Sequence, residues 1–138
     1  MAVVYKKGKV HRISQYFKST EFDCKCKGYC STTILDTRLI EYLQRIREHF
    51  NKPVYINSGY RCYTHNKNVG GVSKSKHLLG MAADIRVKDT APIDVARYAE
   101  SIGVKGIGLY DTFTHIDSRV KKAYWYGQKQ EYRGTFKQ

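Results

Sequence analysis

Apolar side chains recur every three or four positions between residues 35 and 50, with charged side chains between them. This period places the apolar residues along one face of a helix, so the pattern predicts an amphipathic helix over residues 36–50. Thr33 or Asp36 can cap the start of this helix, and Pro53 follows its end. The apolar stripe consists of Leu35, Leu39, Leu43, Ile46 and Phe50.

A second helix is predicted from Thr90 to about Ile102. Pro92 suits the first turn of a helix, and Gly103 lies where a helix commonly ends. The side chains expected to face inward are Val95, Ala96, Ala99 and Ile102.

Four other segments are expected to form strands, because they are rich in β-branched residues or alternate in polarity between turn-forming residues. They are residues 54–57, 83–87, 104–110 and 112–117. Residues 11–22 alternate more loosely and could form a short strand that leads into a turn. Residues 63–75 are polar and contain paired glycines, which predicts a loop.

The chain has 138 residues, a length that fits one domain with a substantial core. We expect a flexible N-terminus at residues 1–9, the folded domain at 10–127 and a polar, mobile tail at 128–138. The aromatic cluster at residues 123–126 either packs in the core or forms a wall of a cleft.

The formal charge is +13, from 25 basic and 12 acidic side chains. Such an excess attracts polyanions in a salt-sensitive way, so nucleic acid and an anionic bacterial cell wall are both candidate partners. Alternatively, the lysines only keep the protein soluble. There is no apolar run near 18 residues, which argues against a membrane span. The N-terminus lacks the apolar core of a signal peptide, so secretion by that route is not expected unless a leader has been removed.

Three residues form a candidate metal site. His77 and Asp84 lie seven positions apart around Gly80, so a loop could bring both side chains to one point. An imidazole and a carboxylate are a good ligand pair for zinc. His115 can supply a third ligand from the predicted strand 112–117, where Asp117 lies on the same face. Three protein ligands leave one position for water, as in catalytic zinc sites.

The four cysteines are a second candidate cluster, with three in one short loop and one remote. They are Cys24, Cys26, Cys30 and Cys62. They could bind a structural zinc ion as a tetrathiolate, although their spacing is not a standard zinc-binding pattern. One disulfide, or free thiols in a reducing cytoplasm, are the alternatives, and the compartment argument places a disulfide behind the other two. Lys25 and Lys27 would favour thiolates at a metal site or as free cysteines.

At these residues the sequence resembles the zinc D-alanyl-D-alanine peptidases of bacteria and their phages, over roughly residues 10–127. The matching residues, in chain order, are Ser58-Gly-Tyr-Arg61, Asn66, Val69-Gly-Gly71, Ser75, His77, Gly80, Ala82, Asp84, Gly106, Gly108, Tyr110, His115 and Asp117. The resemblance implies a small α+β zinc hydrolase that acts on peptidoglycan stem peptides. In fold terms, we expect a small antiparallel sheet with helices packed on it and the zinc site in a cleft on the sheet.

The resemblance also implies roles for individual residues. Arg61 would bind a substrate carboxylate or stabilise an oxyanion, with Tyr60 and Ser75 as further substrate-binding residues. The enzyme would be a monomeric D,D-carboxypeptidase or endopeptidase. It would be a phage or prophage lysin that stays in the cytoplasm until its release to the wall, or an exported protein whose leader is absent here.

The general base is less clearly indicated. Relatives place an acidic residue three positions before the last ligand or a histidine two before it, but this chain has Thr112 and Phe113 there. Asp117 and Asp111 remain as nearby acids. We expect Asp117 to be the base because it shares a strand face with His115, although it could instead orient that imidazole.

Two other classes of function remain open. A catalytically inactive, zinc-containing wall-binding module would keep the metal ligands without the chemistry. A basic nucleic-acid-binding protein would explain the charge, but the aromatic residues do not interleave with basic ones in a recognisable motif, so we expect no nucleic acid partner.

Overall fold

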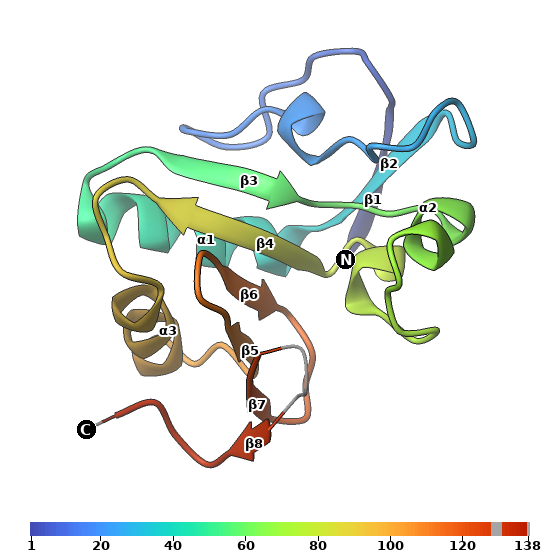
Figure 1. The fold of residues 1–138 in the computed structure, drawn as a ribbon. Coiled ribbons are helices and arrows are strands. Elements are labelled where there is room, and N and C mark those ends of the chain that lie inside the picture. Colours follow the sequence, from blue (N-terminus) through green and yellow to red (C-terminus); the bar gives the residue numbers. More distant parts are fainter. Residues whose placement is uncertain (128–130, 138) are drawn as a thin grey trace.

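A six-stranded sheet forms the centre of the computed structural model, which describes residues 1–127 and 131–137 (Figure 1). The strand order is β3-β4-β6-β5-β7-β8. The strands are β3 (Val54–Ser58), β4 (Ala82–Val87), β5 (Gly106–Leu109), β6 (Thr114–Asp117), β7 (Ala123–Tyr126) and β8 (Glu131–Arg133). The four predicted strands therefore form, and each of their ends lies within two residues of its predicted position.

The sheet is mixed, which corrects the prediction of an antiparallel one. Strand β6 pairs with β4 on one side and β5 on the other, so both of its edges are occupied. The next strand, β7, therefore pairs with the free edge of β5 and runs parallel to it. The remaining neighbours in the sheet pair antiparallel.

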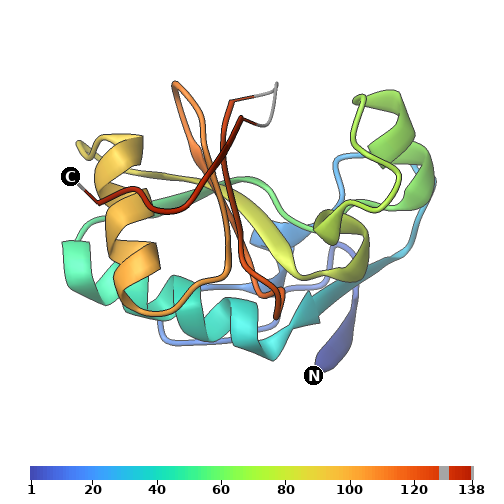
Figure 2. The ribbon, with the colours of Figure 1, turned by 90° about the horizontal axis from the view of Figure 1, so that it is seen from below.

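Helices α1 (Thr37–Phe50) and α3 (Pro92–Ser101) confirm the two predicted helices. Both pack against the core face of the sheet, and Figure 2 shows them on the same side of the strands. The predicted stripe of α1 is largely buried, at Leu39, Leu43 and Ile46. No helix in residues 1–127 and 131–137 has the length and apolar character needed to cross a membrane.

Strand alternation separates two chemistries on the two faces of the sheet. The side chains that join the hydrophobic core are Ala83, Ile85, Val87, Ile107, Ile116 and Tyr124. Their neighbours in sequence face the other way, because successive strand side chains point to opposite faces. That second face carries Asp84, His115, Asp117 and Trp125.

The N-terminus is ordered, which corrects the prediction of a flexible segment at residues 1–9. Strand β1 (Ala2–Lys6) pairs antiparallel with β2 (Thr32–Asp36) in a separate two-stranded sheet. The terminal ammonium of Met1 also lies 2.8 Å from Asp36 Oδ1. Val3, Val4 and Tyr5 suit a strand, but the partner that orders them lies about 30 residues away in the sequence.

Residues 11–22 form no strand beyond a single bridge between Arg12 and Lys18. Phe17 and Phe22 are instead buried in the core, and Phe22 ends a short 3₁₀ helix, η1 (Ser19–Phe22). The predicted loop at 63–75 begins with a short helix, α2 (Tyr63–Asn68), at the far end of the molecule from α3 (Figure 1). This helix is polar all round, so it has no apolar period to detect.

The C-terminal segment is packed rather than mobile over residues 131–137. Strand β8 pairs with β7, and the Phe136 ring is buried against Tyr124 and Tyr126. Helix α3 adds polar contacts, because Glu100 Oε1 accepts from the Phe136 amide at 2.7 Å and Arg97 Nε donates to the Phe136 carbonyl at 2.9 Å. The predicted tail at 128–130 and 138 lies outside the described residues.

The packing of Phe136 predicts that this segment stabilises the domain. Phe136→Ala should lower the free energy of unfolding by about 3 kcal/mol, because a buried ring is replaced by a cavity. Urea denaturation followed by circular dichroism measures this change. Tyr132→Ala is the matched control: that ring is exposed, so its loss should cost less than about 0.5 kcal/mol. Equal effects of the two substitutions would contradict the packing role.

Candidate metal centre

His77 lies in a short 3₁₀ turn, η2 (Lys76–Leu79), just before β4. The Ser75 hydroxyl accepts a hydrogen bond from the His77 amide at 3.2 Å and so caps this turn. The His77 ring is buried, and its Nδ1 lies 2.7 Å from the carbonyl oxygen of Gly59. This contact directs the other ring nitrogen, Nε2, toward β4.

Asp84 and His115 face each other directly across the β4–β6 pair. The same row of the sheet continues through Gly108 on β5 to Trp125 on β7. Because Gly108 has no side chain, the Trp125 ring lies across β5, where a β-carbon would come within 2.6 Å of it. The Trp125 ring centroid is 5.0 Å from that of His115.

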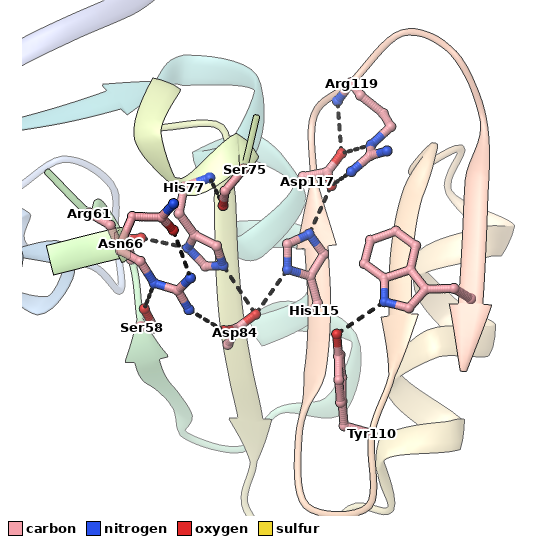
Figure 3. A network of polar contacts seen from close by, with 12 residues as sticks. Ser58, Arg61, Asn66, Ser75, His77, Asp84, Tyr110, His115, Asp117 and Arg119 are labelled. Atoms are coloured by element: carbon pink, nitrogen blue, oxygen red, sulfur yellow. Dashed lines mark hydrogen bonds and ion pairs between the residues drawn. The ribbon is translucent and has the colours of Figure 1, made fainter. Parts of the chain in front are cut away.

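The three predicted ligands converge on one point (Figure 3). Asp84 Oδ1 lies 3.3 Å from His77 Nε2 and 2.9 Å from His115 Nδ1. One ligand atom from each residue lies within 4.8 Å of the others. The structure therefore brings together His77, Asp84 and His115 as the sequence predicts.

The hydrogen bonds of the two imidazoles indicate that this point suits a cation. His77 Nδ1 can only donate to the Gly59 carbonyl, so Nε2 of the neutral ring is an acceptor. His115 Nε2 lies 2.8 Å from Asp117 Oδ2, which makes Nδ1 of the neutral ring an acceptor too. Two imidazole lone pairs and a carboxylate then face one another, an arrangement that favours a bound cation. The donor set fits zinc, which binds imidazole nitrogen and carboxylate oxygen.

The pKa values of these groups follow from the same contacts. Burial would raise the pKa of Asp84, but the close contacts with His115 and His77 hold that pKa well below its ordinary value. Burial lowers the pKa of His77, against the opposing effect of Asp84. Burial also disfavours a charged His115, yet the contacts with Asp117 and Asp84 raise its pKa to about 9.

Asp117 lies behind His115 rather than at the convergence point. Its Oδ2 contacts His115 Nε2, on the opposite side of the ring from Asp84. Arg119 holds the same carboxylate with two hydrogen bonds of 2.7 Å, and its backbone amide adds a third at 3.1 Å. Asp117 is fully buried, and both of its oxygens are engaged. Two roles were predicted for Asp117, a general base and a residue that orients the imidazole. The structure favours the orienting role.

Arg61 lies on the other side of the convergence point. Its Nη2 donates to Asp84 Oδ2 at 3.3 Å, its Nε to Ser58 Oγ at 3.1 Å and its Nη1 to Asn66 Oδ1 at 3.3 Å. The buried Asn66 is in turn fixed by its own bond to the Val72 carbonyl. The guanidinium is therefore held beside a metal ligand, with its side chain 16% exposed.

The other predicted site residues lie further from the convergence point. Ser75 acts as the cap of η2. Tyr60 lies beside the cysteine cluster, and burial, followed by the nearby thiols, raises its pKa. Asp111 is exposed in the turn after β5 and lines a hollow with Pro92 and Tyr126.

Sequence reasoning missed two residues at this centre. Arg119 continues the spacing of two that starts at His115 and Asp117, so this repeat could have revealed it. Trp125 was predicted only as part of an aromatic cluster, yet alternation divides that cluster: Tyr124 faces the core and Trp125 faces His115. Trp125 Nε1 donates to the Tyr110 hydroxyl at 3.1 Å, and this pair borders the centre.

The profile of the Peptidase M15 family matches residues 15–117. This span covers most of the chain and all three candidate metal ligands. The chain therefore belongs to the Peptidase M15 family, which confirms the resemblance seen in the sequence.

A similar protein is the zinc D-Ala-D-Ala carboxypeptidase of Streptomyces albus G, which is 51% identical over 71 residues. The match covers 48% of this chain and 28% of the relative. The chain thus spans well under half of the length of the curated relative that it matches.

The sheet register predicts that Gly106 is needed for metal binding. Gly106 pairs with Asp117, and a β-carbon at position 106 would overlap the Asp117 carboxylate. Gly106→Ala should displace Asp117, release the His115 ring and weaken zinc affinity about 10- to 100-fold. Competition with a chelating dye measures this affinity. Gly134→Ala is the control, since a β-carbon there meets open space; unchanged affinity in Gly106→Ala would refute the argument.

Proposed function

We propose that this protein is a zinc-dependent peptidase that hydrolyses peptidoglycan stem peptides, as a D,D-carboxypeptidase or an endopeptidase. The observation that carries the proposal is the convergence of three metal-binding atoms on one face of the sheet in a member of the Peptidase M15 family. The name of the Streptomyces relative supports both the metal and the substrate.

In this proposal His77, Asp84 and His115 hold the zinc ion. A zinc ion with three protein ligands supplies a bound water whose pKa is lowered to about 7, together with a Lewis acid for the scissile carbonyl. The buried contacts of the ligands fix their orientation before substrate binds. His77 is held by the Gly59 carbonyl, and His115 by the Asp117 carboxylate.

Arg61 is the residue that we assign to the substrate. Its guanidinium lies next to Asp84 and carries hydrogen-bond donors that can bind a substrate carboxylate or a developing oxyanion. Trp125 and Tyr110 lie on the side of His115 opposite to Arg61. The Trp125 ring is near the His115 ring, and Trp125 and Tyr110 are hydrogen-bonded to each other. We place the substrate in a cleft between these two sides. Roles for Tyr60 and Ser75 in substrate binding stay predictions.

The setting of the enzyme also stays a prediction. A phage or prophage lysin that acts on the wall after its release would use the +13 charge to concentrate at an anionic surface. A monomer is sufficient for the proposed chemistry, because all proposed ligands come from one chain.

The geometry of Asp117 predicts that its substitution acts through zinc binding, whereas substitution of a general base would lower turnover with zinc still bound. Asp117→Asn should reduce zinc affinity and activity together, and activity should return when zinc is added in excess. The reason is that an amide can still contact His115 but no longer stabilises its charge. Zinc content and hydrolysis of a defined stem peptide, measured against zinc concentration, test this outcome.

Asp111→Asn is the matched control, since that exposed carboxylate makes no hydrogen bond to the centre among the described residues. It should change turnover less than about tenfold. A loss of about 10²–10⁴ in Asp117→Asn at full zinc occupancy would instead identify Asp117 as the base.

The charge predicts a difference between two substrates. If the basic surface concentrates the enzyme at the wall, added salt should slow hydrolysis of intact sacculi much more than hydrolysis of a small soluble muropeptide, because salt screens long-range attraction. Initial rates on both substrates over a series of salt concentrations measure this. Equal salt sensitivity of the rates on both substrates would exclude electrostatic attraction of the enzyme to the wall. Salt-dependent binding to duplex DNA without peptidase activity would support a nucleic-acid-binding protein.

A further inference from the structure

The four cysteines meet in one cluster although Cys62 is 32 residues away from the nearest of the others, Cys30. One sulfur atom from each lies within 4.8 Å of all the others. Cys24 and Cys62 are 3.7 Å apart at sulfur, and Cys26 and Cys30 are 3.5 Å apart. All four are free thiols in the structure.

These separations fit a metal-centred tetrahedron. A disulfide needs sulfur atoms at about 2.05 Å. Four sulfurs at the usual zinc–sulfur distance of about 2.3 Å lie about 3.8 Å from one another in a tetrahedron. The Cys24–Cys62 and Cys26–Cys30 separations are near this value, and all four sulfur atoms lie within 4.8 Å of one another.

Hydrogen-bond donors that can compensate negative charge on sulfur lie beside the cluster. Lys7 Nζ lies 3.2 Å from Cys26 Sγ and 3.8 Å from Cys30 Sγ, and the Cys62 amide donates to Cys24 Sγ at 3.3 Å. A divalent ion with four thiolates carries two negative charges, and a buried charge of that kind needs such partners.

The loop that carries Cys26 and Cys30 lacks the buried apolar side chains that usually hold a loop against a hydrophobic core. Residues 25–31 contribute no buried apolar side chain, and Lys25, Lys27 and Tyr29 are exposed. Cys26 and Cys30 are the half-buried members of this segment, and both face the cluster. A loop with so little apolar contact gains its order from cross-linking.

We propose that Cys24, Cys26, Cys30 and Cys62 bind a structural zinc ion that fixes the turn at residues 58–62. Four thiolates close the coordination sphere, so this ion has no position for water and takes no part in hydrolysis. The proposal stands apart from the peptidase function, because it uses none of the residues of the centre formed by His77, Asp84 and His115.

The turn at 58–62 connects the cluster to that centre. Cys62 follows Arg61 directly, and the Tyr60 amide donates to the Phe22 carbonyl at 3.0 Å, two residues before Cys24. The Gly59 carbonyl contacts His77 Nδ1. A metal at the cluster therefore restrains both Arg61 and the residue that orients His77.

Metal content of purified variants tests the proposal. Elemental analysis should give about two zinc ions per chain in the wild type and about one in the double variant Cys26→Ser/Cys30→Ser and in His115→Ala. Cys26 and Cys30 are chosen because they are half-buried, so serine opens no large cavity. One zinc ion in the wild type and none in His115→Ala would overturn the proposal.

Cobalt substitution of the wild-type protein tests the ligands without reliance on folding of a variant. Thiolate-bound cobalt gives intense charge-transfer absorption in the near ultraviolet, whereas imidazole and carboxylate ligands do not. This absorption should be present in the wild type and in His115→Ala. Its absence from the cobalt-loaded wild type, or fewer than four titratable thiols after denaturation without reductant, would also overturn the proposal.

Discussion

The carboxylate of Asp84 is the feature on which the proposed centre depends. It contacts His77, His115 and Arg61, which come from a 3₁₀ turn, a neighbouring strand and the turn after β3. Each contact alone is weak, but together they keep a buried carboxylate ionised. A buried anion beside two imidazole nitrogens favours a bound cation, so folding of these elements and metal binding should stabilise each other.

Two glycines of β5 make this arrangement compatible with a continuous sheet. At Gly106 the Asp117 carboxylate occupies the space of a side chain, and at Gly108 the Trp125 ring does so. The side chains of β6 and β7 therefore meet across β5 instead of standing apart. On the opposite face, the same strand carries Ile107 into the core. One short strand thus supports packing on one face and the ligand environment on the other.

Local patterns predicted the parts of the structure that have a local cause. The period of Leu39, Leu43 and Ile46 identified α1, and alternation placed His115 and Asp117 on one face. The pairing of β1 with β2 and the contacts of Phe136 with α3 were missed, because they depend on partners about 30 to 40 residues away. The parallel β5–β7 pair was missed for a related reason. It depends on which strand edges are already occupied, and the sequence of a single segment does not indicate this.

The position of Asp117 shows why a shared face does not settle a chemical role. Alternation puts its side chain on the same side of β6 as His115, so sequence reasoning alone allows either a base or an orienting residue. The register favours the orienting role, since Asp84 on β4 is the direct neighbour of His115, whereas Asp117 pairs with Ala82 and Gly106. Its carboxylate therefore meets Arg119 and the outer edge of the imidazole. An anion held there raises the basicity of a ligand, and Arg119 in turn keeps that anion charged and in place.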